Sequence, residues 1–378
     1  MELSFTPSRP GSLGVELEWI TVDADRGGQV PAAPALLAAL PERLRPRIKA
    51  ELFASTLEIN TSIHQRTDAC FAELAELRRW VLAQPQMARV GLLAAGTHPF
   101  SHWRAQQVSD DPRYHKLLRR MGWMARRFNI FGMHVHVGTG NGARCIEALN
   151  ALLPVMHLFL AVSANSPFWH GDDTALASCR IKVFEGLSQG GMPFYFRDWD
   201  DFAACVARLE ATGSIDSIRE IWWEMRPHPD FGTLEVRICD MPATFEDARA
   251  LVAWIRAEVM TAAAGRRVVD GRVHPSLIRE NRWRACRYGL ASRVIDPASG
   301  AVEPLVDAVA GRLAWLDRCG EAQAEDLELL ARALPRWREG EDGARRQRRL
   351  LAACDGEMAA LVRRMRLEDG WDGEVVVG

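Results

Sequence analysis

The sequence predicts an α+β fold whose antiparallel sheet keeps one polar face. Stretches that alternate apolar and polar residues predict one strand within 11–28 and others at 56–61, 133–137 and 233–238. Long segments of helical spacing separate them. Since the strands alternate instead of being uniformly apolar, one face of the sheet belongs to the core and the other carries polar side chains.

The elements follow in order along the chain. After the first two strands, apolar spacing predicts helices near 68–87, 114–128, 143–164, 199–211 and 244–264. The most apolar stretch, 148–164, contains Asn150, Pro154 and His157 and is too short for a membrane span, so we expect a buried core helix. From about residue 303 the pattern is almost entirely helical. We expect one domain over 1–300 and a helical C-terminal part over 301–378 packed on it.

Composition excludes several classes of function. The chain has 378 residues and a net charge of -2, which removes any bulk electrostatic case for nucleic acid or anionic membrane as a partner. Of the 47 basic residues only Lys49, Lys116 and Lys182 are lysines. No Gly-Lys pair exists for a Walker-type phosphate loop, and few lysines are available for pyridoxal chemistry.

No leader segment is recognisable, so we expect a cytoplasmic protein with reduced cysteines.

Pairs of titratable residues share one face on three predicted strands. Residues two apart on a strand point the same way, as do Glu16 with Glu18, His134 with His136, and Glu235 with Arg237. Glu58 lies on the remaining strand, and Glu51 could join it only if the chain bends between them. A face rich in carboxylates with a minor contribution from imidazole is what Mg²⁺ or Mn²⁺ requires. The sequence therefore predicts a metal site.

Each pair also has a purely structural interpretation. The acids could lie on a solvated face, the histidines could be satisfied in the core, and Glu235 with Arg237 could form a local ion pair. The loop 138–143 formally matches a dinucleotide-binding pattern, but the acid expected about 20 residues later is missing, so we favour a turn and a helix start. The Arg-rich segment 336–349 is interrupted by acids and is interpreted as a solvated helix and loop instead of a nucleic-acid arm.

Several longer motifs resemble the carboxylate-amine ligase family, also called glutamate-cysteine ligase type 2. They are GVELE (14–18), GTHPF (96–100), GMHVHVG (132–138), SPFWHGDDTALASCR (166–180), IWWEMRPHPDFGTLEVRICD (221–240) and RACRYGL (284–290). The resemblance runs from about residue 10 to 300 and weakly beyond. It implies a glutamine-synthetase-like architecture with a ligase catalytic domain over 1–300, in which a curved antiparallel sheet forms a funnel with helices on its outer face.

The resemblance also implies chemistry and site residues. It implies ATP-dependent amide formation through an acyl phosphate, with glutamate and cysteine as the substrates of the type reaction and ATP with Mg²⁺ or Mn²⁺ as cofactors. The metal-site positions fall on Glu16, Glu18, Glu51, Glu58, Glu235 and on His134 or His136. Glu18, Glu235 and Arg237 are the expected catalytic groups. We expect Arg237, Arg180 and Arg226 to contact phosphate or carboxylate, although Arg180 and Arg226 could instead pair with neighbouring acids.

Two alternatives remain open at this point. The same ligase mechanism could act on another amino acid or amine, or the His and Glu cluster could belong to a metal-dependent hydrolase. We expect small-molecule substrates, no nucleic acid and no membrane, with a homodimer favoured only by the resemblance. We further expect Glu18→Ala or Glu235→Ala to abolish ATP turnover while leaving thermal unfolding nearly unchanged.

Overall fold

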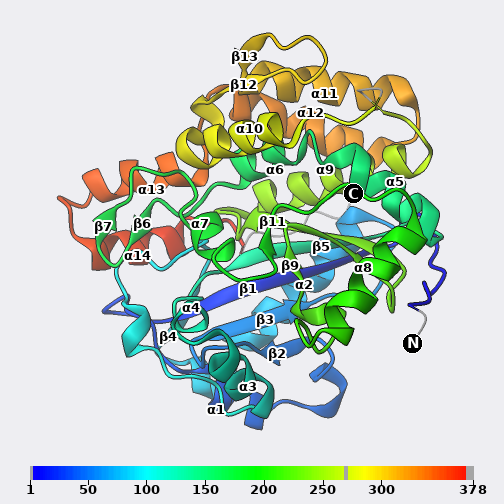
Figure 1. Cartoon of the computed structure of the whole chain (residues 1–378). Coiled ribbons are helices and arrows are strands. Elements are labelled where there is room, and N and C mark those ends of the chain that lie inside the picture. Colours follow the sequence, from blue (N-terminus) through cyan, green and yellow to red (C-terminus); the bar gives the residue numbers. More distant parts are fainter. Residues whose placement is uncertain (1–2, 268–270, 372–378) are drawn as a thin grey trace.

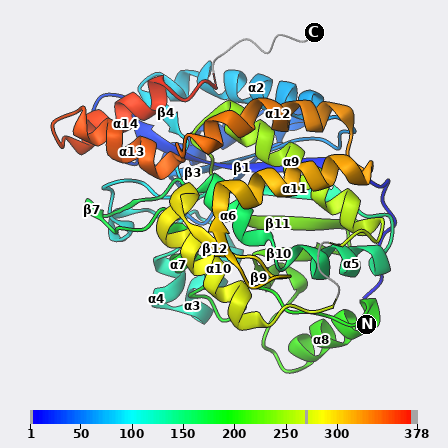
Figure 2. The same ribbon diagram turned by 90° about the horizontal axis from the view of Figure 1, so that it is seen from above.

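The computed structural model describes residues 3–267 and 271–371, which form an antiparallel sheet with helices stacked on one face (Figure 1, Figure 2). The strand order is β10-β11-β5-β1-β3-β2, with β4 also paired to β1, and every pairing is antiparallel. The strands are β1 (Leu13–Asp23), β2 (Ile48–Ala50), β3 (Thr56–Asn60), β4 (Val90–Leu93), β5 (Gly132–Gly138), β10 (Met225–His228) and β11 (Thr233–Asp240). The four predicted strands are thus the centre of this sheet.

One face of the sheet is apolar and packs on helices. Val15, Leu17 and Trp19 of β1 point into the core, as do the alternate residues of β5 and β11. Four helices contact this face: α2 (Thr67–Leu82), α5 (Gly142–Leu152), α6 (Met156–Ser163) and α9 (Phe245–Ala263). A second layer packs on these helices and is formed by α10 (Pro275–Tyr288), α11 (Leu305–Cys319) and α12 (Ala324–Arg338). The α+β class and the helices on the outer face are confirmed.

Smaller elements complete the described chain. They are α1 (Ala33–Ala38), α3 (Pro112–Met121), α4 (Trp123–Arg126), α7 (Arg180–Phe184), α8 (Trp199–Ala211), α13 (Gly343–Ala352), α14 (Met358–Leu367), the strand pairs β6 (Phe168–Trp169) with β7 (Asp172–Asp173), β8 (Gly190–Gly191) with β9 (Trp222–Trp223) and β12 (Arg293–Ile295) with β13 (Val302–Pro304), and the 3-10 turns Glu42–Leu44, Pro85–Met87, Trp103–Ala105, Ile218–Glu220 and Gly289–Ala291.

Two predicted helices are broken in the structure. The helix expected over 143–164 is split into α5 and α6 around Pro154, since proline donates no backbone hydrogen bond and clashes with the preceding turn. The helix expected over 114–128 begins at Pro112 and breaks at Gly122, which has a φ of 56°. No single helix of the described ranges is long and apolar enough to cross a membrane, although α5 and α6 together, bent by 67°, have the necessary length and composition.

Buried ion pairs attach the C-terminal helices to α9. Arg312 of α11 donates from Nε to Glu258 at 2.6 Å, and Arg256 lies 3.3 Å from Asp326 of α12. Both pairs are buried, so removing one partner would leave an uncompensated charge in the core. The helical pattern expected after residue 303 is confirmed, whereas the division at residue 300 stays a prediction.

Candidate active site

The polar face of the sheet brings the predicted site residues together through strand register. Glu235 of β11 lies opposite His136 of β5, and His134 lies opposite Glu16 of β1. On the other side of β1, Glu18 lies opposite Glu58 of β3. Because paired residues of neighbouring strands point to the same face, side chains from four strands converge. No single stretch of sequence contains this arrangement.

Two groups of three side chains have the geometry of cation sites. The first triad is Glu16, His136 and Glu235, and the second triad is Glu18, Glu51 and Glu58. In each triad, one potential ligand atom per residue lies within 4.8 Å of the others. The second triad consists of carboxylates alone and so favours a hard divalent cation, whereas the first adds an imidazole.

The side chains of the first triad fit a bound cation. Nε2 of His136 is buried without a hydrogen-bond partner, 3.4 Å from Glu16 Oε1 and 3.7 Å from Glu235 Oε1. Its other ring nitrogen, Nδ1, is held by the hydroxyl of Thr233 at 3.0 Å. When Nδ1 donates to that hydroxyl, Nε2 carries a lone pair directed at the two carboxylates, which is the orientation of a metal ligand.

The side chains of the second triad also fit a bound cation, in this case on electrostatic grounds. Burial, followed by the charges of Glu58 and Glu18, raises the pKa of Glu51 well above its usual value. Burial and then the charge of Glu16 also raise the pKa of Glu58, although Lys49, at 3.5 Å, opposes this. Three carboxylates held together at this cost are relieved by a bound cation.

Glu51 reaches its place because the chain turns after β2. The side chain of Ser109 donates to the carbonyl of Glu51, and Tyr114 of α3 donates to the carbonyl of Ala50 at 3.0 Å. These contacts fix the bend of the chain after β2, which the sequence permitted but did not predict. The structure therefore brings Glu51 together with Glu18 and Glu58.

His134 takes a different position from His136. Its Nδ1 lies 3.1 Å from Glu16 Oε2 and its Nε2 lies 3.8 Å from Glu18 Oε1, so the ring stands between the two triads. Burial opposes ionisation of Glu16, but the neighbouring imidazoles of His134 and His136 outweigh it and hold the pKa of Glu16 well below its usual range. His134 thus orients Glu16, and His136 is the histidine with ligand geometry.

The three candidate arginines separate into distinct environments. Arg237 donates to Glu235 and keeps a buried Nε without a partner, so it can still take an oxyanion. Arg226 also contacts Glu235, through Nε at 2.9 Å and Nη2 at 2.7 Å, while its Nη1 donates to two backbone carbonyls. These contacts favour the structural role that was left open for Arg226.

Arg180 does not reach the candidate site. Its guanidinium fills the space where a side chain at Gly132 would lie, and it approaches the carbonyls of Arg237 and Ile238 at 3.3 and 3.4 Å. Arg180 also lines neither of the two cavities on the polar face, which are described next. The contacts favour a structural role for Arg180 through backbone carbonyls, and not through the ion pair with an acid that was the alternative, because Gly132 leaves room for a buried arginine behind the site.

Two cavities open on the polar face. The first, which we call the triad cavity, measures about 480 Å³ and is lined by both triads together with Arg226, Arg237 and Trp222. The second, which we call the side cavity, measures about 620 Å³. They share the wall residues Glu16, Lys49, His136 and Phe231. Two ligands could therefore meet across this wall.

Sequence reasoning missed several residues that line these cavities. They include Lys49, Arg113, Arg219, His228, Phe231 and Asn60. The amide of Asn60 donates to Glu58 at 2.6 Å. Lys49 offered a signal, because it lies two positions before Glu51 and directly opposite Glu58 once β2 and β3 pair. Arg113, Arg219 and Phe231 come from a helix end and turns, for which periodicity gives no orientation, whereas Asn60 and His228 are the last residues of β3 and β10.

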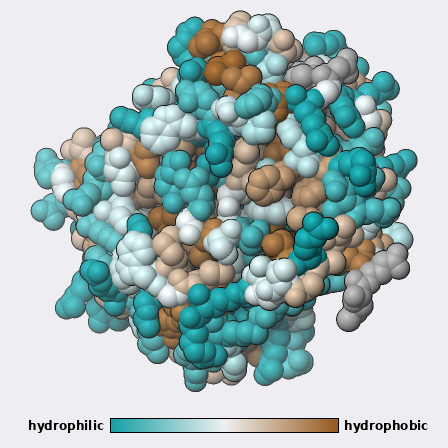
Figure 3. Space-filling view, viewed as in Figure 1, coloured by the Kyte–Doolittle hydropathy of each residue, from teal (hydrophilic) through white to brown (hydrophobic). Residues whose placement is uncertain are grey.

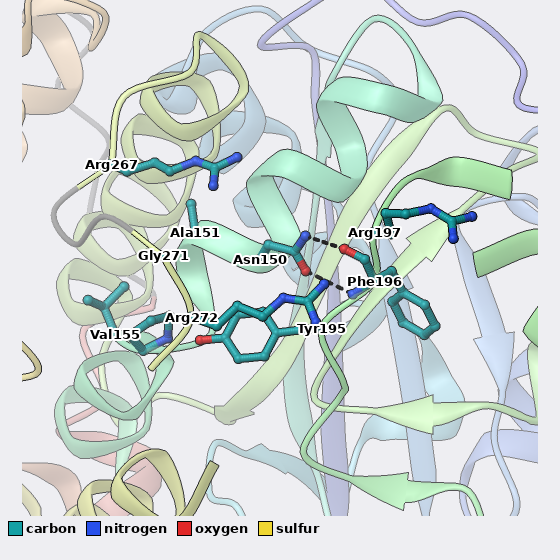
Figure 4. Close-up of a pocket in the computed structure, with 10 residues that line it drawn as sticks. Asn150, Ala151, Val155, Tyr195, Phe196, Arg197, Arg267, Gly271 and Arg272 are labelled. Atoms are coloured by element: carbon teal, nitrogen blue, oxygen red, sulfur yellow. Dashed lines mark hydrogen bonds between the residues drawn. The ribbon is translucent and has the colours of Figure 1, made fainter. Parts of the chain in front are cut away.

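A third cavity, shown in Figure 4, carries no such chemistry. It measures about 300 Å³ and is lined by Arg197, Arg267 and Arg272 beside Asn150 and Tyr195, with no acid among its described lining residues. Asn150 bonds both ways to the backbone of Phe196, and Arg272 lies 5.4 Å from the ring centroid of Tyr195. None of the triad residues lines it.

The alternative interpretations of two motifs are also resolved. Loop 138–141 follows an antiparallel strand, and Asn141 caps α5 by accepting from the amide of Arg144 at 3.0 Å, as expected for a turn and helix start. Within 336–349, Arg336, Arg348 and Arg349 pair with Asp247, Asp173 and Glu341. These three arginines of the segment are therefore paired with acids of the same chain.

The fold is an antiparallel sheet whose polar face carries two triads with the geometry of cation sites. A family model described as glutamate-cysteine ligase family 2 matches residues 12–368. The chain belongs to this family.

Relatives agree with this assignment, and solved structures share the fold. A Gloeobacter violaceus protein with the provisional name glutamate-cysteine ligase 2 is 39% identical over 93% of this chain and 95% of its own. A similarly named Frankia alni protein is 36% identical over the full length of both. Among solved structures, glutamate-cysteine ligase from Francisella tularensis in complex with AMP has a TM-score of 0.69 at 14% identity, covering 97% of this chain and 90% of that one.

A bifunctional glutathione synthetase from Pasteurella multocida also matches with a TM-score of 0.69 at 14% identity. The match covers 95% of this chain but spans only about half, 52%, of that enzyme. At this level of identity both structures show the shared fold alone. The fold expected from the sequence resemblance is thereby confirmed.

Proposed function

We propose that the protein is an ATP-dependent carboxylate-amine ligase that joins glutamate to cysteine through an acyl phosphate. The observation that carries this proposal is the pair of triads, linked by Glu16 and Glu18 on one strand and adjoining Arg237. Family membership and the names of the relatives support the same assignment.

The proposed reaction has two steps. The side-chain carboxylate of glutamate attacks the terminal phosphorus of ATP, which forms an acyl phosphate and releases ADP. The amine of the second substrate then attacks the acyl carbon, loses a proton and expels phosphate. Because the reactants are anions, the main barrier is charge repulsion, and the site must neutralise charge at the transferring group.

The residues of this chain would divide the work. The first triad would hold a cation through Glu16, His136 and Glu235, and the second through Glu18, Glu51 and Glu58. A bound Mg²⁺ or Mn²⁺ supplies positive charge that neutralises phosphate and carboxylate oxygens. Arg237, fixed by Glu235, would add a donor to the transferring group.

The two cavities favour a ligase over a hydrolase. A hydrolase needs one substrate and water, whereas a ligase must place a nucleotide and an acceptor on either side of the reacting phosphoryl group. The triad and side cavities share a wall that includes Glu16 and His136 of the first triad, which supports two ligands meeting there.

An assay for ADP release tests the proposal. Purified protein with ATP and Mg²⁺ should release ADP over many turnovers only when both a carboxylate and an amine substrate are present, and mass spectrometry should find the amide. A screen of amino-acid pairs would separate glutamate with cysteine from other substrates of the same mechanism. Sustained ADP release over many turnovers without any amine, or substrate hydrolysis without ATP, would contradict the proposal. A cytoplasmic location and a homodimer stay predictions.

A further inference from the structure

We propose that the third cavity binds a small anion that carries at least two phosphate or carboxylate groups. We call it the arginine cavity, because Arg197, Arg267 and Arg272 line it (Figure 4). It shares no lining residue with the triad cavity or the side cavity, so the site is separate from the candidate active site. The inference goes beyond the proposed function and does not depend on it.

The first observation is the charge of the arginine cavity. None of its described lining residues is an acid, and uncharged residues complete its wall. Figure 3 shows a molecular face that is mostly hydrophilic, with hydrophobic residues only scattered over it, so such a surface offers a ligand charge more than apolar area. A cavity with cations and no carboxylate repels metal ions and attracts anions. Its volume of about 300 Å³ is at the lower end for small-molecule sites and suits a small ligand.

Arg272 is the arginine best placed to bind the anion. Its guanidinium carbon lies 5.4 Å from the ring centroid of Tyr195, and its side chain extends toward Asn150 in Figure 4. Within residues 3–267 and 271–371, no acid forms an ion pair with Arg272. Since an aromatic ring contacts the face of a guanidinium, the N–H groups at the guanidinium edge stay available to oxyanions.

Tyr195 is itself fixed by backbone contacts. Its hydroxyl accepts from the amide of Val273 at 3.2 Å, which ties the residue after Arg272 to the same ring. Asn150 of α5 donates to the carbonyl of Phe196 at 2.6 Å and accepts from its amide at 3.1 Å. The segment that carries Tyr195 is thus attached to α5, and this wall of the cavity is formed before a ligand binds. A preformed wall loses little conformational entropy on binding.

Arg267 supplies the second cation. Its Nη2 lies 3.6 Å from Oε1 of Glu147, and the two side chains are 39% and 46% exposed. An ion pair this open contributes little, so an anion with more than one charge can displace Glu147. In Figure 4, Arg267 and Arg272 lie on either side of Ala151, which places one guanidinium at each end of a ligand between them. Two planar guanidinium groups favour a ligand with two oxyanion groups.

Arg197 has a smaller role than the other two arginines. Its Nε donates to the neighbouring Asp198 at 2.8 Å, and its side chain points away from Arg272 in Figure 4. Arg197 is therefore already paired and would add only to the positive charge around the cavity. The contacts of the ligand are assigned to Arg267 and Arg272.

The experiment measures anion binding to the full-length, metal-free protein. Isothermal titration calorimetry with pyrophosphate and, separately, with citrate distinguishes a phosphate ligand from a carboxylate ligand. We expect the wild type to bind at least one of these probes at a single site. Arg272→Gln and Arg267→Gln should each weaken that binding about tenfold, because each removes charge-assisted hydrogen bonds. Arg272→Lys should retain part of the affinity, since an ammonium keeps the charge but not the planar geometry.

Two control variants remove exposed arginines elsewhere. Arg332→Gln acts on α12, at a side chain that is 73% exposed and lines neither the arginine cavity nor the cavities on the polar face. Arg219→Gln acts on an exposed arginine of the triad cavity. Both controls should bind the probes as the wild type does, and circular dichroism should show all variants folded.

Three results would overturn the inference. The first is a wild type that binds neither probe at about 1 mM. The second is normal binding by both Arg272→Gln and Arg267→Gln. The third is a loss of affinity in Arg219→Gln or Arg332→Gln as large as in those two variants. The ADP assay tests the proposed function separately, so either conclusion can fail while the other stands.

Discussion

The hydroxyl of Thr233 lies 3.0 Å from Nδ1 of His136 and so turns Nε2 of that ring toward Glu16 and Glu235. A hydrogen bond of this kind holds the direction of a metal-binding histidine ring. The first triad thus depends on a residue that offers no ligand atom itself.

Thr233→Val should weaken Mn²⁺ binding at the first triad by about 10-fold to 100-fold, because the ring loses the partner that holds its orientation. Thr233→Ser keeps the hydroxyl and should bind Mn²⁺ as the wild type does. Titration followed by electron paramagnetic resonance measures the free Mn²⁺ directly. Equal affinity in the valine and serine variants would show that the hydroxyl does not orient His136.

Lys49 competes with a cation for Glu58, from which its ammonium is 3.5 Å distant. Lys49→Met should therefore tighten Mn²⁺ binding at the second triad by up to about fivefold, the range of a partly exposed ion pair. Lys182→Met is a suitable control, because Lys182 pairs with Glu185, which lines neither cavity. Weaker Mn²⁺ binding in Lys49→Met than in the control would contradict this role.

Glu18 and Glu235 should behave differently on substitution, which corrects the expectation from sequence that both are neutral to stability. Glu235 is buried between Arg226 and Arg237, so Glu235→Gln leaves two guanidinium groups without a charged partner. We expect it to cost about 3–5 kcal/mol of unfolding free energy. Glu18→Gln can still accept from the amide of Gly132 and should unfold nearly as the wild type does.

Both variants should lose ATP turnover, because each removes a carboxylate from a triad. Chemical unfolding monitored by circular dichroism, alongside the ADP assay, separates the two effects. Turnover at the wild-type rate in Glu18→Gln would exclude the second triad from the reaction.

The raised pKa of Glu51 predicts a pH dependence of stability in the metal-free protein. Burial and the charges of Glu58 and Glu18 raise the pKa above its usual 4.5, so the folded chain holds a proton that the unfolded chain has released. This contribution to stability is present below pH 4.5 and is lost as the pH rises through the raised pKa.

Glu51→Gln removes this titration. In chelator, the unfolding free energy of the wild type should fall relative to the variant as the pH rises, by about 1.4 kcal/mol for each unit of pKa shift. Adding Mn²⁺ should reduce the loss in the wild type, since the cation neutralises the carboxylates. Parallel curves for the two proteins would mean that Glu51 titrates normally.

Strand alternation was sufficient to predict which acids share a face, because a strand repeats every two residues whatever it pairs with. It predicted Glu16 with Glu18 and His134 with His136 correctly. Register is different, since the pairing of Glu235 with His136 depends on contacts between segments about 100 residues apart and on an irregularity between Val236 and Cys239.

Arginine roles were harder to predict for the same reason. The position of Arg180 depends on the absence of a side chain at Gly132, and that of Arg226 on carbonyls of a 3-10 turn. Neither relationship leaves a periodic pattern in the sequence. Phe231 likewise comes from a turn, where its orientation depends on packing against residues 6–8.

The central claim, ligation through an acyl phosphate, is tested most directly by following oxygen. The protein is incubated with ATP, Mg²⁺, cysteine and glutamate labelled with ¹⁸O in its side-chain carboxylate, and the phosphate released is analysed by ³¹P nuclear magnetic resonance. The proposed reaction transfers one carboxylate oxygen to each phosphate, so the phosphate should carry ¹⁸O. Unlabelled phosphate formed together with the amide would contradict an acyl-phosphate intermediate.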